Sequence, residues 1–266
     1  MQHYQQLITQ LSSRGPLGVA FSGGVDSTLL AKAAHDALGD RAVAITIHGP
    51  MQLRGELQAA RKLAQQIGIR QIELRLDWSE LPELHTNPSD RCYLCKSSII
   101  MLCLRQLASL SDADHSWSLI DGSNLDDLQA HRPGRRALQE LAVGSPLAEL
   151  GFSKAEIRSV SRQLGLPGWD RPAQSCLLTR FLHNNPLTDA DLRRVESCEE
   201  ELHSMGCRLV RARCLGDGVR LELGQQELAA VTANPLLQKA IEEVFAKAGF
   251  SRVVIDSSGY RSGSMD

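Results

Sequence analysis

"AFSGGVDSTLL" runs from Ala20 to Leu30, and this stretch decides the fold. The apolar run LGVAF before the loop is typical of a buried strand, and the helical pattern DSTLLAKAAHDAL follows it at once. The paired glycines permit backbone conformations that other residues resist. Successive amides in such a loop can point at one anion, helped by the N-terminus of the helix. The stretch therefore predicts a phosphate-binding loop between a strand and a helix.

This loop differs from two common phosphate-binding motifs. It lacks the Gly-Lys-Ser/Thr ending of a Walker A loop and the glycine spacing of a dinucleotide fingerprint. It resembles the PP-loop of ATP pyrophosphatases, which implies ATP binding and AMP transfer. The candidate ATP-binding residues are Ser22, Gly23, Gly24, Val25, Asp26 and Ser27. The two serines add hydroxyl donors, and Asp26 either caps the helix or helps to bind Mg²⁺.

Short apolar runs alternate with helical patterns over residues 1–170, which predicts βαβ units with a parallel sheet. Strands are expected at 17–21, 42–48, 69–76 and 117–122, and helices at 26–38, 54–68, 96–110 and 153–165. Ser153 and Glu156 have the spacing of a capping box at the start of the last helix. We therefore expect an α/β fold, a Rossmann-like PP-loop domain over residues 1–170.

The pattern changes after the proline-flanked segment around Cys176. A long helical pattern over 188–206 precedes two strand patterns joined by Gly216-Asp217-Gly218, which is a hairpin signal. Two more helical patterns and the apolar run FSRVVID follow. Residues 171–266 are therefore predicted to form a smaller C-terminal α+β domain.

The composition fits a soluble globular protein. The 266 residues are 42% hydrophobic and 23% charged, with a formal net charge of −2. This charge argues against nucleic acid as a partner, since a nucleic-acid-binding domain usually has a strongly basic pI. The N-terminal stretch MQHYQQLITQLSSRG lacks the features of a signal peptide, and no apolar run has the length of a membrane span. We expect a cytoplasmic protein that does not contact membranes.

Seven cysteines argue against a disulfide framework, because the number is odd and the compartment expected is reducing. Cys92 and Cys95 form a lone CxxC pair, which is weak evidence for zinc. A structural role, a substrate contact and metal or redox chemistry all stay open for this pair. Cys103 lies in a helical apolar pattern and is expected in the core.

Six further motifs sharpen the resemblance. They are NPSDRCYLCK (87–96), DGSNLDD (121–127), RPGRRAL (132–138), SPLAELGFSKAEIR (145–158), LGLPGWDRPAQSCLLTR (164–180) and the C-terminal DSSGYRSGSMD (256–266). Together they resemble the LarE family of ATP-dependent sacrificial sulfur transferases, which takes part in the biosynthesis of the nickel-pincer nucleotide cofactor. The resemblance covers nearly the whole chain in the same order.

The resemblance implies a reaction in which ATP and Mg²⁺ adenylylate a carboxylate of a pyridinium dicarboxylic acid mononucleotide. A cysteine thiolate then displaces AMP, and its Cβ–S bond breaks. The product keeps the sulfur as a thiocarboxylate, and the protein keeps dehydroalanine. Cys176 matches the sacrificed cysteine. The family also implies a small nucleotide substrate, a homo-oligomer, and substrate binding, sulfur transfer and oligomerisation in residues 171–266.

Several polar residues are candidates for the rest of the site. Arg211 and Arg213 alternate along a predicted strand and therefore share one face, which suits phosphate binding or forms a solvated arginine ladder. Asn124 and Asp127 follow a strand, where ligand crevices of α/β sheets lie, although a capped turn would look the same. The remaining candidates are Thr179 and Arg180 for substrate binding, and Glu200 and Glu222 for a divalent metal or a general base.

A second possible source of sulfur is a [4Fe-4S] cluster, which some relatives bind through three cysteines. Cys176, Cys207 and Cys214 could be its ligands, with Cys198 as another candidate, and Cys214 stands where the family often has histidine. The odd spacing of Cys207 and Cys214 would put them on opposite faces of a regular strand.

A PP-loop fold also fits a tRNA-thiolation enzyme, an amide-forming ligase and an ATP-sensing module without catalysis.

Overall fold

The computed structural model describes residues 1–129, 134–172 and 174–261, and the chain forms two compact units. The N-terminal unit comprises Met1–Leu81 and Asp90–Gln174, and the C-terminal unit comprises Pro82–Ser89 and Ser175–Asp266. A division into domains after residue 170 stays a prediction. Arg132, Pro133, Ala173 and residues 262–266, which belong to motifs quoted above, lie outside the described residues.

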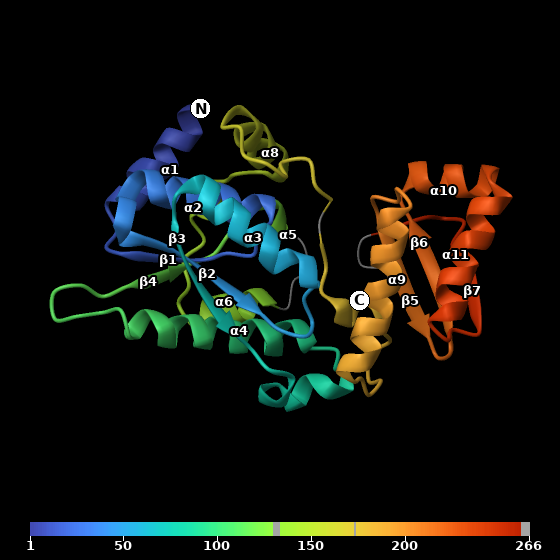
Figure 1. Cartoon of the computed structure of the whole chain (residues 1–266). Coiled ribbons are helices and arrows are strands. Elements are labelled where there is room, and N and C mark those ends of the chain that lie inside the picture. The colour runs from blue at the N-terminus through green and yellow to red at the C-terminus, as the bar shows by residue number, and fades with distance from the viewer. Residues whose placement is uncertain (130–133, 173, 262–266) are drawn as a thin grey trace. The chain divides into compact units, whose positions relative to one another are not determined.

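The N-terminal unit is built on a parallel four-stranded sheet in the order β3-β2-β1-β4 (Figure 1). The strands are β1 (Leu17–Ala20), β2 (Ala42–His48), β3 (Arg70–Arg75) and β4 (Ser118–Ile120). Leu17 is in register with Ala42 on one side and with Ser118 on the other, both in parallel pairs. The α/β fold predicted from the alternating pattern is therefore confirmed.

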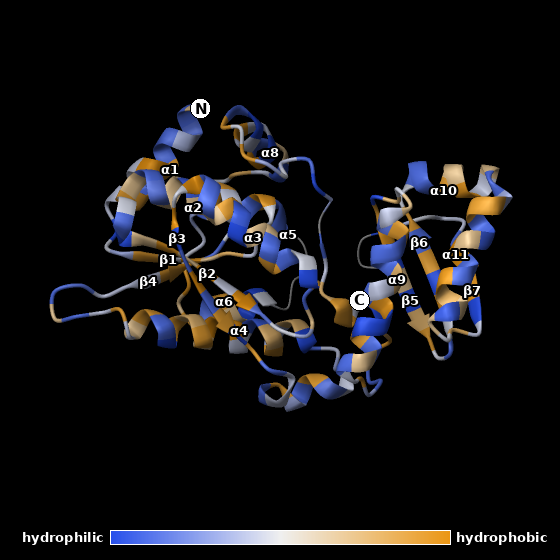
Figure 2. Cartoon of the chain, viewed as in Figure 1, coloured by the Kyte–Doolittle hydropathy of each residue, from blue (hydrophilic) through white to orange (hydrophobic). Residues whose placement is uncertain are grey.

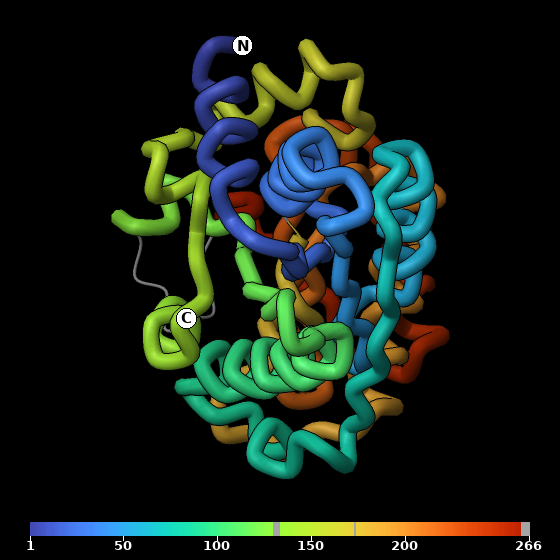
Figure 3. Tube along the Cα trace, turned by 90° about the vertical axis from the view of Figure 1, so that its left-hand side faces the viewer, coloured from blue at the N-terminus to red at the C-terminus, as the bar shows by residue number. Residues whose placement is uncertain are grey.

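Helices cover both faces of this sheet (Figures 1 and 3). One apolar cluster joins the sheet to α1 (Gln2–Ser12), α2 (Val25–Leu38), α3 (Arg54–Ile67) and α8 (Lys154–Gln163). The other joins it to α4 (Arg91–Ala108) and α6 (Gly134–Glu140). Successive residues of β2 alternate between the clusters, with Ala44 in the first and Val43 and Ile45 in the second. This alternation explains why the central strands are apolar without interruption, as Figure 2 shows for β1.

Local signals fix the ends of several helices. Gly68 ends α3 in the left-handed conformation, with φ at 85°. The side chain of Ser153 accepts a hydrogen bond from the Glu156 amide at the start of α8, as the capping-box spacing predicts. The short helices and 3-10 turns that complete this unit are α5 (Leu125–Gln129), α7 (Pro146–Glu149), η1 (Gly39–Arg41) and η2 (Trp78–Glu80).

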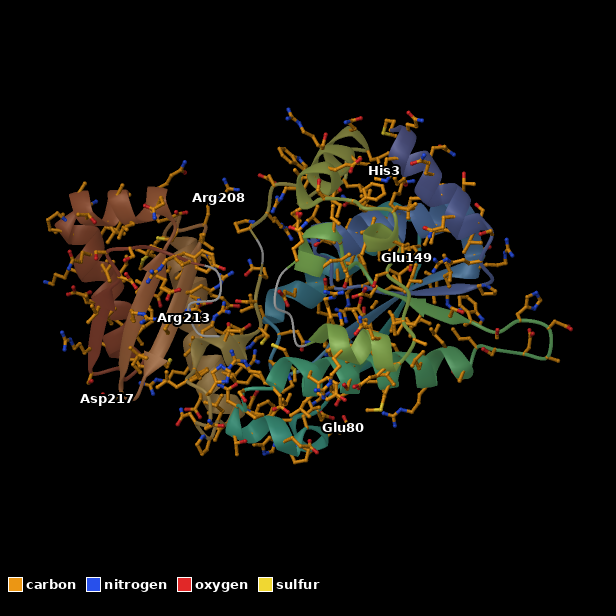
Figure 4. The ribbon with its side chains drawn as sticks, turned by 180° about the vertical axis from the view of Figure 1, so that it is seen from behind. His3, Glu80, Glu149, Arg208, Arg213 and Asp217 are labelled. Atoms are coloured by element: carbon orange, nitrogen blue, oxygen red, sulfur yellow. The ribbon has the colours of Figure 1, made fainter. Side chains whose placement is uncertain are left out.

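The N-terminal helix α1 is tied to the unit by polar contacts as well as by its apolar face. The ring of His3 stacks on Phe152 at 3.9 Å and contacts the Glu156 carboxylate at 2.7 Å. Glu149, labelled in Figure 4, accepts a hydrogen bond from Arg14 at 2.6 Å. These contacts anchor the first helix to the segment that leads into α8.

The C-terminal unit has a three-stranded mixed sheet in the order β5-β6-β7. β5 and β6 are antiparallel, and β6 and β7 are parallel. The elements are η3 (Pro82–Thr86), η4 (Leu177–Arg180), α9 (Asp189–Ser204), β5 (Val210–Leu215), β6 (Gly218–Leu223), α10 (Gln225–Ala233), α11 (Pro235–Lys247) and β7 (Arg252–Ile255). The smaller α+β part is thus present as predicted, with η3 added from an earlier segment of the chain.

The two faces of this sheet differ in character. Arg211 is in register with Glu222 and Arg213 with Arg220, so charged residues share one face. Cys214, on the opposite face, lines a small cavity with Val195 of α9 and with Phe250. The predicted alternation of the two arginines along β5 is therefore confirmed.

Among the described residues, no helix has the length and apolar character needed to cross a membrane.

Candidate functional site

The phosphate loop has the backbone shape that its glycines were expected to allow. Gly23 has φ at 75°, and a Cβ at this position would lie 3.2 Å from the Cα of Ala60 on α3. Gly24 is the N-cap of α2 and has no side chain to cap it. The loop therefore passes close to α3 and leaves the first amides of a 14-residue helix without a side-chain cap. Helix N-termini of this kind attract anions.

The two serines of the loop form hydrogen bonds within the loop itself. The Ser27 hydroxyl donates to the carbonyl of Gly24 at 3.1 Å and accepts from the Ser22 amide at 3.3 Å. The hydroxyl of Ser22 is 3.2 Å from that of Ser27 and accepts from the Gly24 amide at 3.3 Å. Ser22 is exposed, whereas Ser27 is buried. Ser27 is therefore placed to shape the loop, and Ser22 is placed to meet a ligand.

Asp26 does not cap α2, because it lies inside the helix and its carboxylate points to two partners elsewhere. It forms an ion pair with Lys154, the first residue of α8, and accepts from the side-chain amide of Asn124 at 3.3 Å. Lys154 was not predicted as a site residue. Its signal was its position directly after the N-cap Ser153 in the motif GFSKAEIR.

The loop after β4 lies against the phosphate loop. A Cβ on Gly122 would be 2.9 Å from the Ser27 amide, which explains the glycine. The Asn124 side-chain oxygen accepts from the Asp127 amide at 3.2 Å, and the Asp127 carboxylate accepts from the Asn124 backbone amide at 3.2 Å. These bonds form the capped turn that was the alternative to a ligand-binding role for Asn124 and Asp127. Asn124 also reaches the phosphate loop through Asp26.

Asp121, directly after β4, is a second polar centre in this unit. Its carboxylate is buried and accepts from Ser145 at 2.7 Å, from the Ser123 hydroxyl at 2.9 Å and from Lys96 at 3.1 Å. These contacts bring Lys96 of α4 to the carboxyl end of the sheet, where α/β proteins bind ligands.

In the C-terminal unit, Cys176 is the N-cap of η4 and is half-buried. Its carbonyl oxygen accepts from the Thr179 hydroxyl at 2.8 Å, from the Thr179 amide at 3.1 Å and from Arg180 at 3.2 Å. We call residues 175–180 the cysteine turn. These bonds fix the backbone of the cysteine, while the residue keeps access to solvent.

Arg180 is fully buried and binds protein groups on both sides. Its Nε and Nη2 donate to Glu199 at 3.0 and 2.8 Å. Its Nη1 donates to the Ser175 carbonyl and hydroxyl at 2.8 Å each, and to the Thr179 hydroxyl at 3.1 Å. We predicted a carboxylate role for Glu200, but the structure leaves Glu200 exposed and puts its neighbour Glu199 beside the cysteine turn. Substrate binding by Arg180 stays a prediction.

The arginines of β5 lie next to the same turn. Arg213, labelled in Figure 4, donates to the Thr179 carbonyl at 2.8 Å and to Glu222 at 3.0 Å. Arg220 also contacts Glu222, at 3.2 Å. Arg211 lies over the ring of Tyr260 at 5.5 Å, and burial, followed by the charge of Arg180, lowers its pKa. This concentration of buried positive charge favours an anionic ligand.

Asn87 also contacts the segment that follows Cys176, and sequence reasoning gave it no role. Its buried side-chain amide donates to the carbonyls of Leu182, Phe181 and Leu178 at 2.9, 3.2 and 3.3 Å. Its one signal was its place at the start of the motif NPSDRCYLCK. The segment that carries η3 therefore helps to hold the end of the cysteine turn.

The predicted metal and cluster ligands have different surroundings from those expected. Glu222 binds two arginines, which does not suit a cation site, and the described residues contain no group of three His, Cys, Asp or Glu that could hold a metal ion. Cys207 precedes β5 rather than lying in it, so the strand argument does not apply. Burial raises the pKa of Cys207, and raises that of Cys214 to about 12. Cys176, Cys207 and Cys214 are thus not gathered into a metal-binding group in the described structure.

Three more cysteines lie in the N-terminal unit. Cys92 is exposed and Cys95 half-buried in the first turns of α4, which begins five residues before the predicted start at 96. Cys103 lies in the apolar cluster under α4, as predicted, and burial raises its pKa to about 12.

Comparison with known proteins agrees with this arrangement. The asparagine synthase family matches residues 4–109, which include the phosphate loop. An uncharacterized protein of Synechocystis sp. is 41% identical over 93% of this chain and 91% of its own. The pyridinium-3,5-bisthiocarboxylic acid mononucleotide synthase of Lactiplantibacillus plantarum is 29% identical over 98% of this chain and 92% of its own. A subunit of the glutamine-hydrolyzing GMP synthase of Archaeoglobus fulgidus is 26% identical over 56% of this chain and 50% of its own. Full-length similarity on both sides of the cysteine turn, with a PP-loop fold beneath it, shows that the chain belongs to the LarE family of the PP-loop superfamily.

Proposed function

We propose that this chain is an ATP-dependent sulfur transferase that converts a carboxylate of a pyridinium dicarboxylate mononucleotide into a thiocarboxylate, with Cys176 as the sulfur donor. The observation that carries the proposal is the cysteine turn, which presents a half-buried cysteine beside the buried arginines of β5. The relative from Lactiplantibacillus plantarum supports the substrate class, because its name describes a bisthiocarboxylic acid mononucleotide.

In the first step the N-terminal unit binds ATP. The N-terminus of α2 receives the phosphates, and Ser22 and Lys154 add hydrogen-bond donors beside it. Asp26 is the carboxylate of this loop, and the proposal assigns it to Mg²⁺ although it is paired with Lys154 in the ligand-free chain. When bound, Mg²⁺ would supply charge neutralisation on the phosphates. The substrate carboxylate attacks the α-phosphate, and pyrophosphate leaves.

In the second step the Cys176 thiolate attacks the acyl carbon and AMP leaves, so a thioester joins the chain to the substrate. A base then removes the Cα proton of Cys176. The Cα–H electrons form the Cα=Cβ bond, and the Cβ–Sγ electron pair stays with the sulfur as the thiocarboxylate. Residue 176 becomes dehydroalanine, so each chain acts once.

The anionic phosphate of the mononucleotide belongs beside β5 in this proposal. Arg211 and Arg213 share one face of the strand, and Arg213 also holds the cysteine turn through the Thr179 carbonyl. Guanidinium groups bind phosphate with two parallel hydrogen bonds, which lysine cannot do. Thr179 adds a hydroxyl, although the structure directs it to the Cys176 carbonyl.

Intact-protein mass spectrometry tests the proposal. The chain is incubated with ATP, Mg²⁺ and the dicarboxylate mononucleotide, and the Cys176→Ser variant serves as the control. We expect the parent chain to lose the mass of one H₂S at residue 176 while the small product gains sulfur. An unchanged protein mass together with sulfurated product would overturn the sacrificial route, and absence of both AMP and product would overturn the whole proposal.

Amide formation is the second candidate, favoured by the similarity to the GMP synthase subunit. It uses the same adenylylated intermediate, with ammonia as the nucleophile. An AMP-forming reaction that needs ammonia and proceeds equally well in Cys176→Ser would support it over sulfur transfer.

A further inference from the structure

One buried carboxylate beside the cysteine turn has no role in the chemistry proposed above. Glu199 lies on α9 and is 1% exposed, and its partner Arg180 is 0% exposed. The two side chains meet through two hydrogen bonds of 3.0 and 2.8 Å. Such bidentate pairs fix the orientation of the guanidinium as well as its position.

Glu199 occupies one edge of the Arg180 guanidinium and leaves the other edge to the cysteine turn. That other edge, Nη1, donates to the Ser175 carbonyl at 2.8 Å and to the Cys176 carbonyl at 3.2 Å. Glu199 sets the plane of the guanidinium. The positions of these two carbonyls depend on that plane because both accept hydrogen bonds from Nη1.

Glu199 is itself fixed to the sheet. Its Oε1 accepts from the backbone amide of Ala212 on β5 at 2.8 Å. An unbroken series of hydrogen bonds therefore runs from the backbone of β5 through Glu199 and Arg180 to the carbonyl of Cys176. The neighbouring residues of β5 are Arg211 and Arg213, the proposed phosphate binders.

Stability alone is a weak reason for this arrangement. A buried ion pair often stabilises a fold no more than well-packed apolar side chains of similar volume would. What the ion pair adds is a fixed orientation of the groups bonded to it. Such orientation matters for catalysis because reaction rates depend on the placement of a nucleophile to within a fraction of an ångström.

We propose that Glu199 is a positioning residue that acts through Arg180 to fix the direction of the Cys176 thiol relative to β5. The part of this inference that concerns sulfur transfer rests on the proposed function. The part that concerns the orientation of the thiol does not, so the two can fail separately.

The first test measures Cys176 in the ligand-free protein. The rate of its alkylation by iodoacetamide is followed by peptide mass spectrometry in the parent chain and in Glu199→Gln. The matched control is Glu196→Gln, which removes another fully buried carboxylate of α9 whose partner is Arg193. We expect the Cys176 rate to rise several-fold in Glu199→Gln only. Equal rates in all three proteins would overturn the inference.

The second test removes the whole ion pair, because a lone buried charge in Glu199→Gln can impair folding. The double variant Arg180→Met with Glu199→Gln has no uncompensated charge, and the carboxamide oxygen introduced at position 199 can still accept from the Ala212 amide. We expect it to fold, as a cooperative urea transition shows, while single-turnover sulfur transfer at saturating mononucleotide slows by about 10- to 100-fold. Parental transfer in this double variant would overturn the inference.

The two tests separate the inference from the proposed function. If the parent chain transfers no sulfur but the alkylation rate of Cys176 still depends on Glu199, the positioning role stands and the reaction is wrong. If the parent chain transfers sulfur and both variants match it in alkylation and transfer, the reaction stands and the positioning role is wrong.

Discussion

Lys154 and Asp26 form an ion pair although 128 residues separate them in the sequence. The pair places an ammonium group at the phosphate loop, beside the N-terminus of α2. We expect this group to neutralise charge on the phosphates of bound ATP as well as on Asp26.

Replacement of Lys154 by Met should therefore weaken ATP binding by about 10- to 100-fold, the usual effect of losing one hydrogen bond to a charged group. Equilibrium binding of a non-hydrolysable ATP analogue measures this. Lys32→Met is the matched control, because Lys32 pairs with Asp36 farther along the helix that follows the loop. Equal affinity in the Lys154 and Lys32 variants would contradict the role of Lys154.

Gly23 should tolerate alanine poorly for two separate reasons. Its φ of 75° disfavours any side chain, and a Cβ would press on Ala60. Gly151 has φ at 77° with open space around it, so Gly151→Ala isolates the first effect. Gly151→Ala should lose about 1–2 kcal/mol in the free energy of unfolding, and Gly23→Ala should lose more because of the added contact, both measured in denaturant. Only Gly23→Ala should also lose ATP affinity, and a similar loss in Gly151→Ala would count against the loop geometry.

Arg211→Lys should raise the mononucleotide concentration needed for half-maximal transfer by about tenfold or more, because lysine keeps the charge but loses the two-point geometry. The dependence of single-turnover transfer on mononucleotide concentration measures this. Arg252→Lys, at an exposed position of β7, is the control. An unchanged concentration dependence in Arg211→Lys would remove Arg211 from the substrate site.

Glu199→Gln should lower the free energy of unfolding by about 3 kcal/mol, since it leaves the charge of Arg180 buried without its partner. The double variant with Arg180→Met should regain most of that loss. Urea unfolding of the three proteins measures both effects. A double variant that stays as unstable as the single one would show that the ion pair itself stabilises the fold.

Five of the seven cysteines should separate into two groups at about pH 8, where a thiol whose pKa is raised far above that pH forms little of the reactive thiolate. Burial raises the pKa of Cys103 and Cys214 to about 12, and that of Cys198 to about 11. These three thiols should label slowly in the folded protein, whereas the more accessible Cys92 and Cys176 should label quickly. Peptide mass spectrometry after brief alkylation identifies each site. Fast labelling of Cys214 would contradict the burial of its side chain on β5.

Much of the fold could be predicted from local patterns. The run AVAITIH coincides with β2, and the turn at Gly216-Asp217 joins β5 to β6 as its residues indicate. Helix α1 was missed, although Tyr4, Leu7 and Leu11 are buried at helical spacing. The amphipathic signal was therefore in the sequence, and the polar residues between obscured it.

The candidate site was less predictable, because its contacts join residues far apart in the chain. Alternation along a strand was enough to put Arg211 and Arg213 on one face. Nothing local distinguishes Glu199 from Glu200 in a run of three glutamates, and only the packing of α9 on β5 buries the first of them. Asn87 likewise donates hydrogen bonds to carbonyls that lie 91 to 95 residues farther along the sequence.

The origin of the transferred sulfur atom tests the central claim most directly. The chain is produced with cysteine that carries a heavy sulfur isotope, and it then reacts with ATP, Mg²⁺ and the dicarboxylate mononucleotide in the presence of unlabelled sulfide. Sacrifice of Cys176 predicts that the product carries heavy sulfur and that residue 176 becomes dehydroalanine. A product that carries light sulfur, made by a chain whose Cys176 is intact, would contradict it.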